Sequence, residues 1–194
     1  IIFRVHEIPD ISLFTNLWQR LASENGINGF HFVAIHDNEN ELIEKGIHSF
    51  VQKQPERHKL NNLPTIKEKI LLKVFKYLKL KPKNKIDQID YINYLQNYPQ
   101  YKLRENEYPI IYPDWDSSPR SGEDGWMFHN SSPEKFGELV KKSINIINNQ
   151  KNNNDNILLI KSWNEWAEGN YLEPDTKFGM KYLKVLKNEL LKSK

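Results

Sequence analysis

The side chains best suited to chemistry lie between residues 163 and 173, where three glutamates, two tryptophans and a tyrosine occur together. The cluster follows a short apolar run, residues 157–160, of the kind that forms a buried strand. Carboxyl groups act as acids and bases, and aromatic rings line ligand sites. A lone Trp or Glu is more often structural, but this density at a strand end favours a ligand site over core packing or surface ion pairs.

Glu165 and Glu168 are three residues apart, so both carboxyl groups can face the same cleft if the chain bends into a helical turn there. Two carboxyls in one aromatic site take different roles, one ionised and one protonated, because each affects the charge of the other. The cleavage or formation of a glycosidic bond needs such a pair, an acid for the leaving oxygen and a base or nucleophile. Glu165 and Glu168 are therefore the predicted catalytic residues.

The neighbouring side chains are predicted to contact the substrate. Trp163 and Trp166 offer faces on which a pyranose ring can stack, and Asn164 offers a hydrogen-bond donor and acceptor for a hydroxyl. Tyr171 and Glu173 complete this predicted binding surface.

A second cluster lies in residues 113–120 and contributes Trp115, Asp116 and Arg120. Asp116 either binds a sugar hydroxyl or pairs with Arg120 to hold the loop, and the sequence leaves both alternatives open. His36, after the apolar run 29–35, is a further predicted substrate contact. The histidines do not have metal-ligand spacing and no phosphate-binding Gly-rich loop follows a strand, so neither a metal nor a cofactor is expected.

The scaffold alternates predicted strands with predicted helices. Apolar runs predict five strands, at 1–5, 29–35, 47–51, 108–112 and 157–163. Helical periodicity follows four of these strands, beginning at 13, 42, 133 and 176. This alternation predicts an α/β fold with a parallel sheet, whose ligand site lies at the carboxyl ends of the strands. Residues 53–107, with helical patterns at 65–80 and 90–98, are predicted to be an insertion.

Composition excludes several classes of protein. The formal net charge is +3 over 194 residues and no cysteine is present, so nucleic-acid binding and disulfide or thiolate chemistry are not expected. No apolar run approaches the ~20 residues of a membrane span. The first residues do not resemble a signal peptide, which favours a cytoplasmic protein. The chain opens inside a predicted strand without an initiator Met, as a fragment would.

Several motifs together resemble one known family. Residues 162–169 (SWNEWAEG), residues 172–175 (LEPD) and Gly179 resemble the closing signature of the WbsX-like glycosyltransferases, a family related to glycoside hydrolase family 99. Residues 8–10, 17–18, 25–29 and 113–120 resemble earlier blocks of that family in the same order.

The resemblance implies a (β/α)8 barrel and a carbohydrate-active enzyme of O-antigen, lipopolysaccharide or capsular polysaccharide biosynthesis. Its substrates are then an oligosaccharide or a sugar donor. Carried onto this sequence, Glu165 is the base, acting on the sugar's own 2-hydroxyl with net retention, and Glu168 is the acid/base. One alternative is a retaining, endo-acting glycoside hydrolase of family 99 type. Another is a truncated carbohydrate-binding remnant without catalysis.

A complete barrel has eight strands in about 250 residues, and this sequence has five strand candidates. Residues 1–194 are therefore expected to be one partial catalytic domain, the C-terminal portion of the barrel. The missing N-terminal half is the partner that it needs. Because a half barrel leaves strand edges unpaired, the chain alone is expected to be poorly soluble, incompletely folded or inactive.

Overall fold

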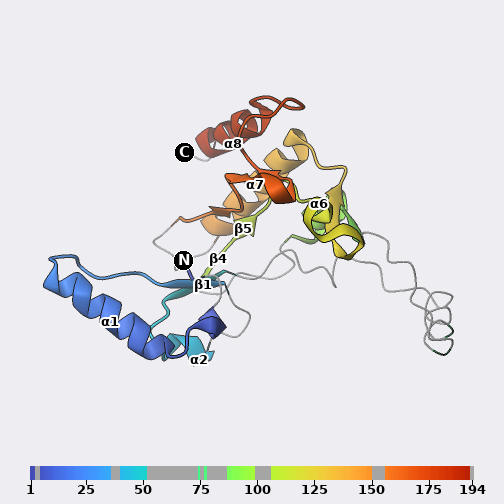
Figure 1. Ribbon diagram of the computed structural model, residues 1–194. Coiled ribbons are helices and arrows are strands. Elements are labelled where there is room, and N and C mark those ends of the chain that lie inside the picture. Colours follow the sequence, from blue (N-terminus) through green and yellow to red (C-terminus); the bar gives the residue numbers. More distant parts are fainter. Residues whose placement is uncertain are drawn as a thin grey trace. The chain divides into compact units, whose positions relative to one another are not determined.

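The computed structural model describes residues 1–2, 5–35, 40–51, 74, 77, 87–98, 106–149 and 156–192 (Figure 1). The chain divides into two compact units. The first comprises residues 1–54, 101–111 and 143–159, and the second comprises residues 55–100, 112–142 and 160–194.

The described elements of the first unit are short, apart from one helix. In chain order they are η1 (Val5–Glu7), α1 (Ile11–Glu24), β1 (Val33–Ile35), α2 (Asn40–Ile43), β2 (Ser49–Val51), β4 (Glu107–Tyr108) and β5 (Ile110–Ile111). The amphipathic helix α1 begins where the Asp10 carboxylate accepts a hydrogen bond from the Leu13 N–H at 2.8 Å. Its end is set by Gly26, which adopts a positive φ of 71°.

Three strands of this unit form a parallel sheet in the order β1-β2-β4. Val33 pairs with Ser49 in the register of β1 and β2, and Phe50 pairs with Glu107 in that of β2 and β4. Ile2 extends the sheet by a parallel bridge to Ala34. One cluster of the hydrophobic core of this unit comprises Val5, Ile11, Ala34, Leu42, Ile47 and Phe50.

The second unit carries the predicted site. Its elements are β3 (Asp87–Asp90), α5 (Tyr91–Asn97), α6 (Ser118–Ser121), η2 (Gly122–Asp124), β6 (Trp126–His129), β8 (Asn164–Glu165), η3 (Trp166–Glu168), β9 (Asn170–Tyr171) and α8 (Lys181–Lys192). Two elements have residues in both units: α7 (Pro133–Asn148) and β7 (Leu159–Ile160). β7 pairs with β5, and the Leu159 N–H donates to the Pro109 carbonyl at 2.9 Å.

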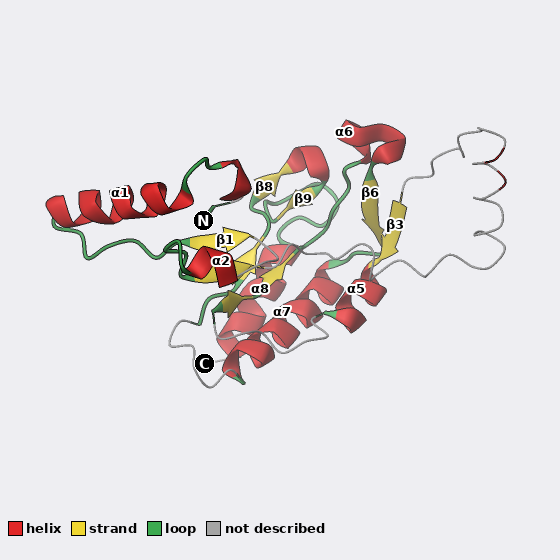
Figure 2. Cartoon of the chain, turned by 90° about the horizontal axis from the view of Figure 1, so that it is seen from below, coloured by secondary structure: helices red, strands yellow, loops and turns green. Residues whose placement is uncertain are grey.

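A parallel pair of strands and an aromatic core organise this unit. β3 and β6 lie side by side, with Ile89 paired to Phe128 (Figure 2). Phe128 packs on Tyr91 and Tyr94, with ring centroids 5.1 and 5.0 Å apart. The Tyr91 hydroxyl donates to the Tyr112 carbonyl at 2.6 Å, which satisfies a polar group inside an apolar cluster. The core therefore fixes the backbone that leads from residue 112 into the predicted site loop.

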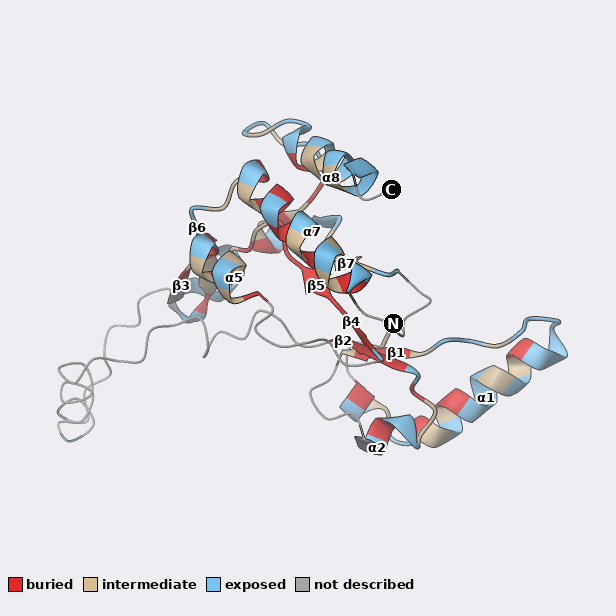
Figure 3. Cartoon of the chain, turned by 180° about the vertical axis from the view of Figure 1, so that it is seen from behind, coloured by how far each residue is buried: buried red, intermediate tan, exposed pale blue. Residues whose placement is uncertain are grey.

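Helix α7 buries one face and exposes the other (Figure 3). Phe136, Leu139 and Val140 are fully buried, as expected from their helical spacing. Phe136 contacts Tyr182 of α8 at a centroid distance of 5.6 Å. The predicted start of α7 is confirmed: Pro133 is its first residue, and the Ser132 hydroxyl accepts a hydrogen bond from the Lys135 N–H.

The alternation of strands and helices with parallel pairing is confirmed, but several elements differ from prediction. Val5, predicted to end the first strand, lies instead in the turn η1, and its side chain is buried in the core with 3% of its surface exposed. β6 was not predicted, and it begins at Trp126, the last residue of a predicted loop. β3 was not predicted either, because Ile89 is its only apolar residue. The predicted helix at 65–80 lies outside the described residues, apart from positions 74 and 77. Within the described part of the chain, no helix is long and apolar enough to cross a membrane.

Candidate active site

The segment 164–171 folds into a small antiparallel hairpin. Asn164 pairs with Tyr171 and Glu165 with Asn170, so β8 and β9 are its two arms (Figure 2). The 3₁₀ turn η3 connects them, and Gly169 ends the turn in the left-handed conformation at φ 58°. The turn predicted between Glu165 and Glu168 is present, and the hairpin around it is an addition to the prediction.

Ser162 and Asn170 fasten the hairpin to the end of β7. The Ser162 N–H donates to Oδ1 of Asn170 at 3.0 Å, and the Ser162 hydroxyl donates to the Asn170 carbonyl at 2.6 Å. The same hydroxyl accepts a hydrogen bond from the Glu165 N–H at 3.2 Å. Because Asn170 is fully buried, these bonds are shielded from water and hold the backbone of Glu165 in place.

The two predicted catalytic glutamates lie at the two ends of this turn and differ in environment. Glu165, at the end of β8, is half-buried, whereas Glu168, at the end of η3, is buried with 6% of its surface exposed. Within the described residues, the Glu165 carboxylate has no hydrogen-bond or ion-pair partner. Glu165 is therefore open to a ligand, and Glu168 is held by the protein.

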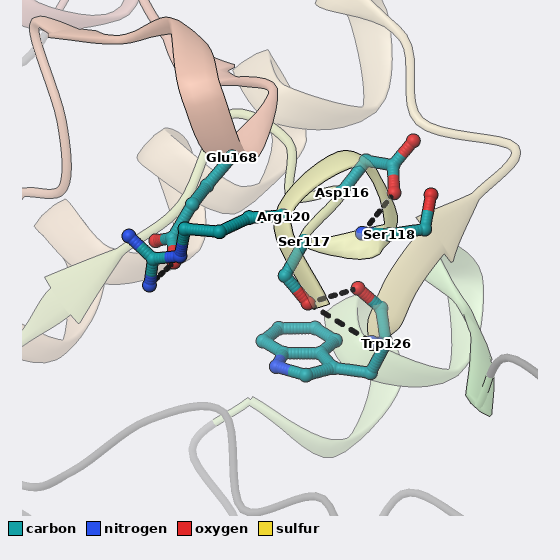
Figure 4. Close-up of polar contacts among 6 residues, drawn as sticks. All are labelled: Asp116, Ser117, Ser118, Arg120, Trp126 and Glu168. Carbon is teal, nitrogen blue, oxygen red and sulfur yellow. Dashed lines mark hydrogen bonds and ion pairs between the residues drawn. The ribbon is translucent and has the colours of Figure 1, made fainter. Parts of the chain in front are cut away.

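The partner of Glu168 is Arg120. Its guanidinium, on α6, forms an ion pair with Oε1 of Glu168, and Figure 4 shows the two side chains meeting. The sequence left open whether Asp116 pairs with Arg120. Arg120 pairs with Glu168 instead, and the Asp116 carboxylate accepts a hydrogen bond from the Ser118 N–H at 2.9 Å (Figure 4). Asp116 still reaches Glu168 through the backbone, because its N–H donates to the Glu168 carbonyl at 2.6 Å.

The loop that carries Arg120 is anchored on β6. Ser117 exchanges two hydrogen bonds with the backbone of Trp126 through its hydroxyl, each 3.0 Å long (Figure 4). Asp116 also forms an antiparallel bridge with Met127. Arg120 thus reaches Glu168 from a backbone that is fixed by its own strand contacts.

Trp166 and Tyr171 form an aromatic stack beside the glutamates. Their ring centroids are 3.7 Å apart and their planes differ by 14°. The Trp166 indole N–H donates to Glu173 at 2.7 Å, and the Tyr171 hydroxyl donates to Asp175 at 3.1 Å. With Tyr171 against one face, Trp166 remains 48% exposed. The stack is therefore a rigid platform with aromatic surface left for a ligand.

The remaining residues predicted to contact the substrate differ in how exposed they are. Trp163 and Asn164 are exposed on the hairpin. Trp115 is only 8% exposed, because its ring stacks on Trp126 at 5.0 Å and the Lys161 ammonium lies 4.1 Å from its centroid. Trp115 thus packs within the unit more than it presents a free face.

His36 lies outside the described residues, so its predicted contact remains a prediction. Among the described residues, no three histidine or acidic side chains come together as a metal-ligand set.

Asp114, which the sequence did not single out, is a buried carboxyl next to the site loop. The Ser131 hydroxyl donates to it at 2.7 Å and the Trp115 N–H donates at 2.8 Å. Burial raises the pKa of Asp114 from its ordinary value to about 6, and these two hydrogen bonds oppose the rise. The carboxyl therefore takes up a proton more readily in the folded chain than in the unfolded one.

Asp114→Asn should consequently change how stability depends on pH. A raised folded pKa means that this carboxyl favours folding below about pH 4, and that the benefit is lost as pH rises to about 6. The free energy of unfolding of the wild type should fall by about 1–3 kcal/mol relative to the variant across that interval. Urea unfolding of both proteins at pH 4, 5, 6 and 7 measures this difference. A constant difference at all four values would contradict the raised pKa.

Gly169 allows the hairpin to approach the loop of Asp116. A Cβ at this position would lie 3.2 Å from the Asp116 Cβ and 3.3 Å from its backbone nitrogen. Gly169→Ala should therefore push the turn away from that loop, beyond the ~1–2 kcal/mol cost of a left-handed alanine. Gly179→Ala is the matched control, since Gly179 has a similar φ of 55° and nothing within 4 Å. Thermal unfolding should show the larger loss for Gly169→Ala; equal losses would argue against close approach.

Sequence reasoning missed the residues that support the site. Ser162, Asn170 and Asp175 act through hydrogen bonds to the hairpin and the platform, and the Gly169-Asn170 dipeptide, a pair typical of turns, is the signal that could have indicated one of them. Lys161 was also assigned no role, although its ammonium lies within electrostatic reach of both glutamates.

Comparison with known proteins assigns the sequence to a family. The sequence model of the family described as "Glycosyltransferase WbsX" matches residues 1–186. Two proteins of Xanthomonas campestris pv. campestris, each named "Uncharacterized protein WxcX", are 23% identical over 195 residues. The alignment covers 100% of this chain and 27% of each relative, so the chain spans about a quarter of their length.

A solved structure titled "Glycoside hydrolase-like protein" has a similar fold, with a TM-score of 0.54 and 14% sequence identity. The match covers 93% of this chain and 49% of that one. At this identity the likeness concerns the fold alone. The family match, in contrast, extends over nearly all of the sequence, including the hairpin with both glutamates. The chain therefore belongs to the WbsX glycosyltransferase family.

Proposed function

We propose that this chain carries catalytic residues of a carbohydrate-active enzyme that makes or remodels glycosidic bonds in cell-surface polysaccharide. The observation that carries the proposal is the η3 turn, which places Glu165 and Glu168 at its two ends beside the Trp166–Tyr171 stack. Two carboxyls next to an aromatic platform are the groups that glycosidic chemistry uses. Membership of the WbsX family supports a carbohydrate substrate.

The two glutamates receive different roles. Glu165 is the base: its carboxylate has no partner among the described residues and can accept a proton from a sugar hydroxyl. Glu168 is the acid/base that protonates the leaving oxygen, and Arg120 holds its carboxyl in position. General acid–base catalysis needs side chains placed within hydrogen-bond reach of the reacting atoms, and the fixed hairpin supplies such placement.

The platform supplies binding. The exposed surface of Trp166 is where we place a sugar ring, and Asn164 and Trp163 on the same hairpin extend that surface. Asp116 is proposed to bind a hydroxyl with the carboxylate oxygen that does not face Ser118.

For the fold, we propose that the chain is the C-terminal portion of a (β/α)8 barrel. The parallel pairing of β1 with β2, β2 with β4 and β3 with β6 supports this assignment. So does the extent of the match to the glycoside hydrolase-like structure, which covers 49% of that chain. A barrel of this kind binds its substrate at the carboxyl ends of the strands.

Product analysis by mass spectrometry tests the function and separates transfer from hydrolysis. The purified protein is incubated in H₂¹⁸O with tetrasaccharides of glucan, mannan, galactan and rhamnan, with and without nucleotide-activated sugars. Transfer gives a longer product without ¹⁸O, and hydrolysis gives a shorter product labelled at its reducing end. Glycan binding that survives both Glu165→Gln and Glu168→Gln, without any product from the wild type, would instead indicate a non-catalytic binding protein.

A further inference from the structure

Lys161 lies directly after β7, at the entry to the hairpin that carries both glutamates. Its side chain is half-buried, and its ammonium is held over the Trp115 ring at 4.1 Å from the centroid. Trp115 is itself fixed by its stack on Trp126. A cation over an aromatic face is attracted by the negative charge of that face, so this contact fixes where the ammonium lies.

The ammonium has unused hydrogen-bonding capacity. A lysine carries three N–H donors, and none of them has an acceptor among the residues that the structure describes. Glu165 is its complement, a carboxylate to which no described residue donates. A half-buried donor and an acceptor that both lack protein partners are groups that a ligand can satisfy.

The charges around Lys161 come from three elements. Glu168 of η3 and Glu165 of β8 attract its ammonium, and Arg120 of α6 repels it. Arg120 and Glu168 are already paired with each other, which leaves Lys161 and Glu165 as the second cation and the second anion of the group. Arg120 and Glu168 are therefore paired with each other, whereas Lys161 and Glu165 each have no hydrogen-bond or ion-pair partner among the described residues.

We propose that Lys161 contacts the substrate, donating a hydrogen bond to the oxygen of the same sugar hydroxyl whose proton Glu165 accepts. The inference rests on the proposed function and adds a residue to it. As the O–H bond breaks, the proton passes to Glu165, and the oxygen's electron pair forms the new bond to the anomeric carbon. The leaving oxygen departs with the bonding pair and receives the proton that Glu168 carries in its acid form, in which the carboxyl accepts a hydrogen bond from Arg120 instead of forming an ion pair with it. The ammonium stabilises the negative charge that develops on the attacking oxygen.

This role has a pH signature. Burial lowers the pKa of Lys161 from its ordinary value, although Glu168 and Glu165 oppose the change. The ammonium should therefore lose its charge, and the site its activity, at a lower pH than an exposed lysine would. An arginine at this position stays charged throughout that range.

Two substitutions test the proposal on the tetrasaccharide or sugar donor that the wild type converts in the product assay. Lys161→Met keeps the stem over Trp115 and should lower kcat/KM about 10- to 100-fold, the effect of losing a charged hydrogen bond. Lys161→Arg should retain most activity, and its alkaline limb in a plot of kcat/KM against pH should move upward or disappear. A role in packing alone would leave that limb unchanged. Circular dichroism checks that both variants are folded.

The possible failures are distinguishable. If Lys161→Met keeps its kcat/KM and the alkaline limb is the same in Lys161→Arg, while Glu165→Gln is inactive, the Lys161 proposal is wrong and the function stands. If the wild type neither converts nor binds any of the four tetrasaccharides by saturation-transfer NMR, both are overturned. Lys184→Met, on the exposed side of α8, is the matched control and should change neither quantity.

Discussion

Glu165→Gln is expected to lower turnover by about 10²- to 10⁴-fold, the range that a general base contributes. The amide has nearly the same shape as the carboxylate but cannot accept the proton. Because the Glu165 side chain has no partner among the described residues, the thermal midpoint should stay within about 1–2 °C of the wild type. Initial rates and a thermal melt of the same preparations measure both effects.

The matched control for this substitution is Glu138→Gln, an exposed position on α7. It removes the same charge from the chain away from the hairpin and should leave the rate unchanged. A Glu165→Gln variant that turns over as fast as Glu138→Gln would remove Glu165 from the mechanism.

Glu168→Gln should lower turnover by a similar factor and should also lower stability. The Glu168 side chain is 8% exposed and contacts the Arg120 guanidinium, whose side chain is 64% exposed. Losing the ionic half of this pair costs about 1 kcal/mol, since water screens the exposed arginine. A thermal melt should therefore show a lower midpoint for Glu168→Gln than for Glu165→Gln.

Arg120→Met provides the comparison for that loss. It breaks the same pair from the other side, so the combined Arg120→Met, Glu168→Gln variant should be less destabilised than the sum of the two single variants. Strict additivity would show that the pair contributes nothing to stability. A fully active Glu168→Gln would show that the residue is not the acid.

Much of the fold follows from local patterns in the sequence. The spacing of Phe136, Leu139 and Val140 predicts α7, and all three are buried. Asp10 and Pro133 mark the starts of α1 and α7 because their side chains suit those positions. β3 could not be found in the same way, since its pairing with β6 depends on contacts between residues about forty positions apart.

For the site, the residue types identified the segment that carries it but not the contacts between its side chains. The density of carboxyls and aromatics identified the segment 163–173, and the turn between Glu165 and Glu168 is present. The partner of Arg120 was not predictable, because choosing Glu168 over Asp116 requires knowing that the loop of Asp116 packs on Gly169. Lys161 could not be identified from the sequence, because lysines are common at strand ends. Only the structure shows that its ammonium lies over Trp115 and has no hydrogen-bond acceptor among the described residues.

The hairpin fixes the backbone at both glutamates. Ser162 and Asn170 fix the backbone at one end of η3, while the Asp116 N–H fixes the Glu168 carbonyl at the other. The turn between these points is short, so the backbone positions of the two glutamates are fixed relative to each other. Positioning of this kind is a large part of what an enzyme contributes to rate.

Chemical rescue of Glu165→Ala tests the central claim most directly. Removing the side chain leaves space at the end of β8 for a small carboxylate from solution. If Glu165 is the catalytic carboxylate, the variant should be inactive on the wild-type substrate, and sodium formate should restore a measurable rate that rises with its concentration. Formate should not restore Glu168→Ala to the same extent, since that carboxyl also holds Arg120. A Glu165→Ala variant as active without formate as the wild type would contradict the account.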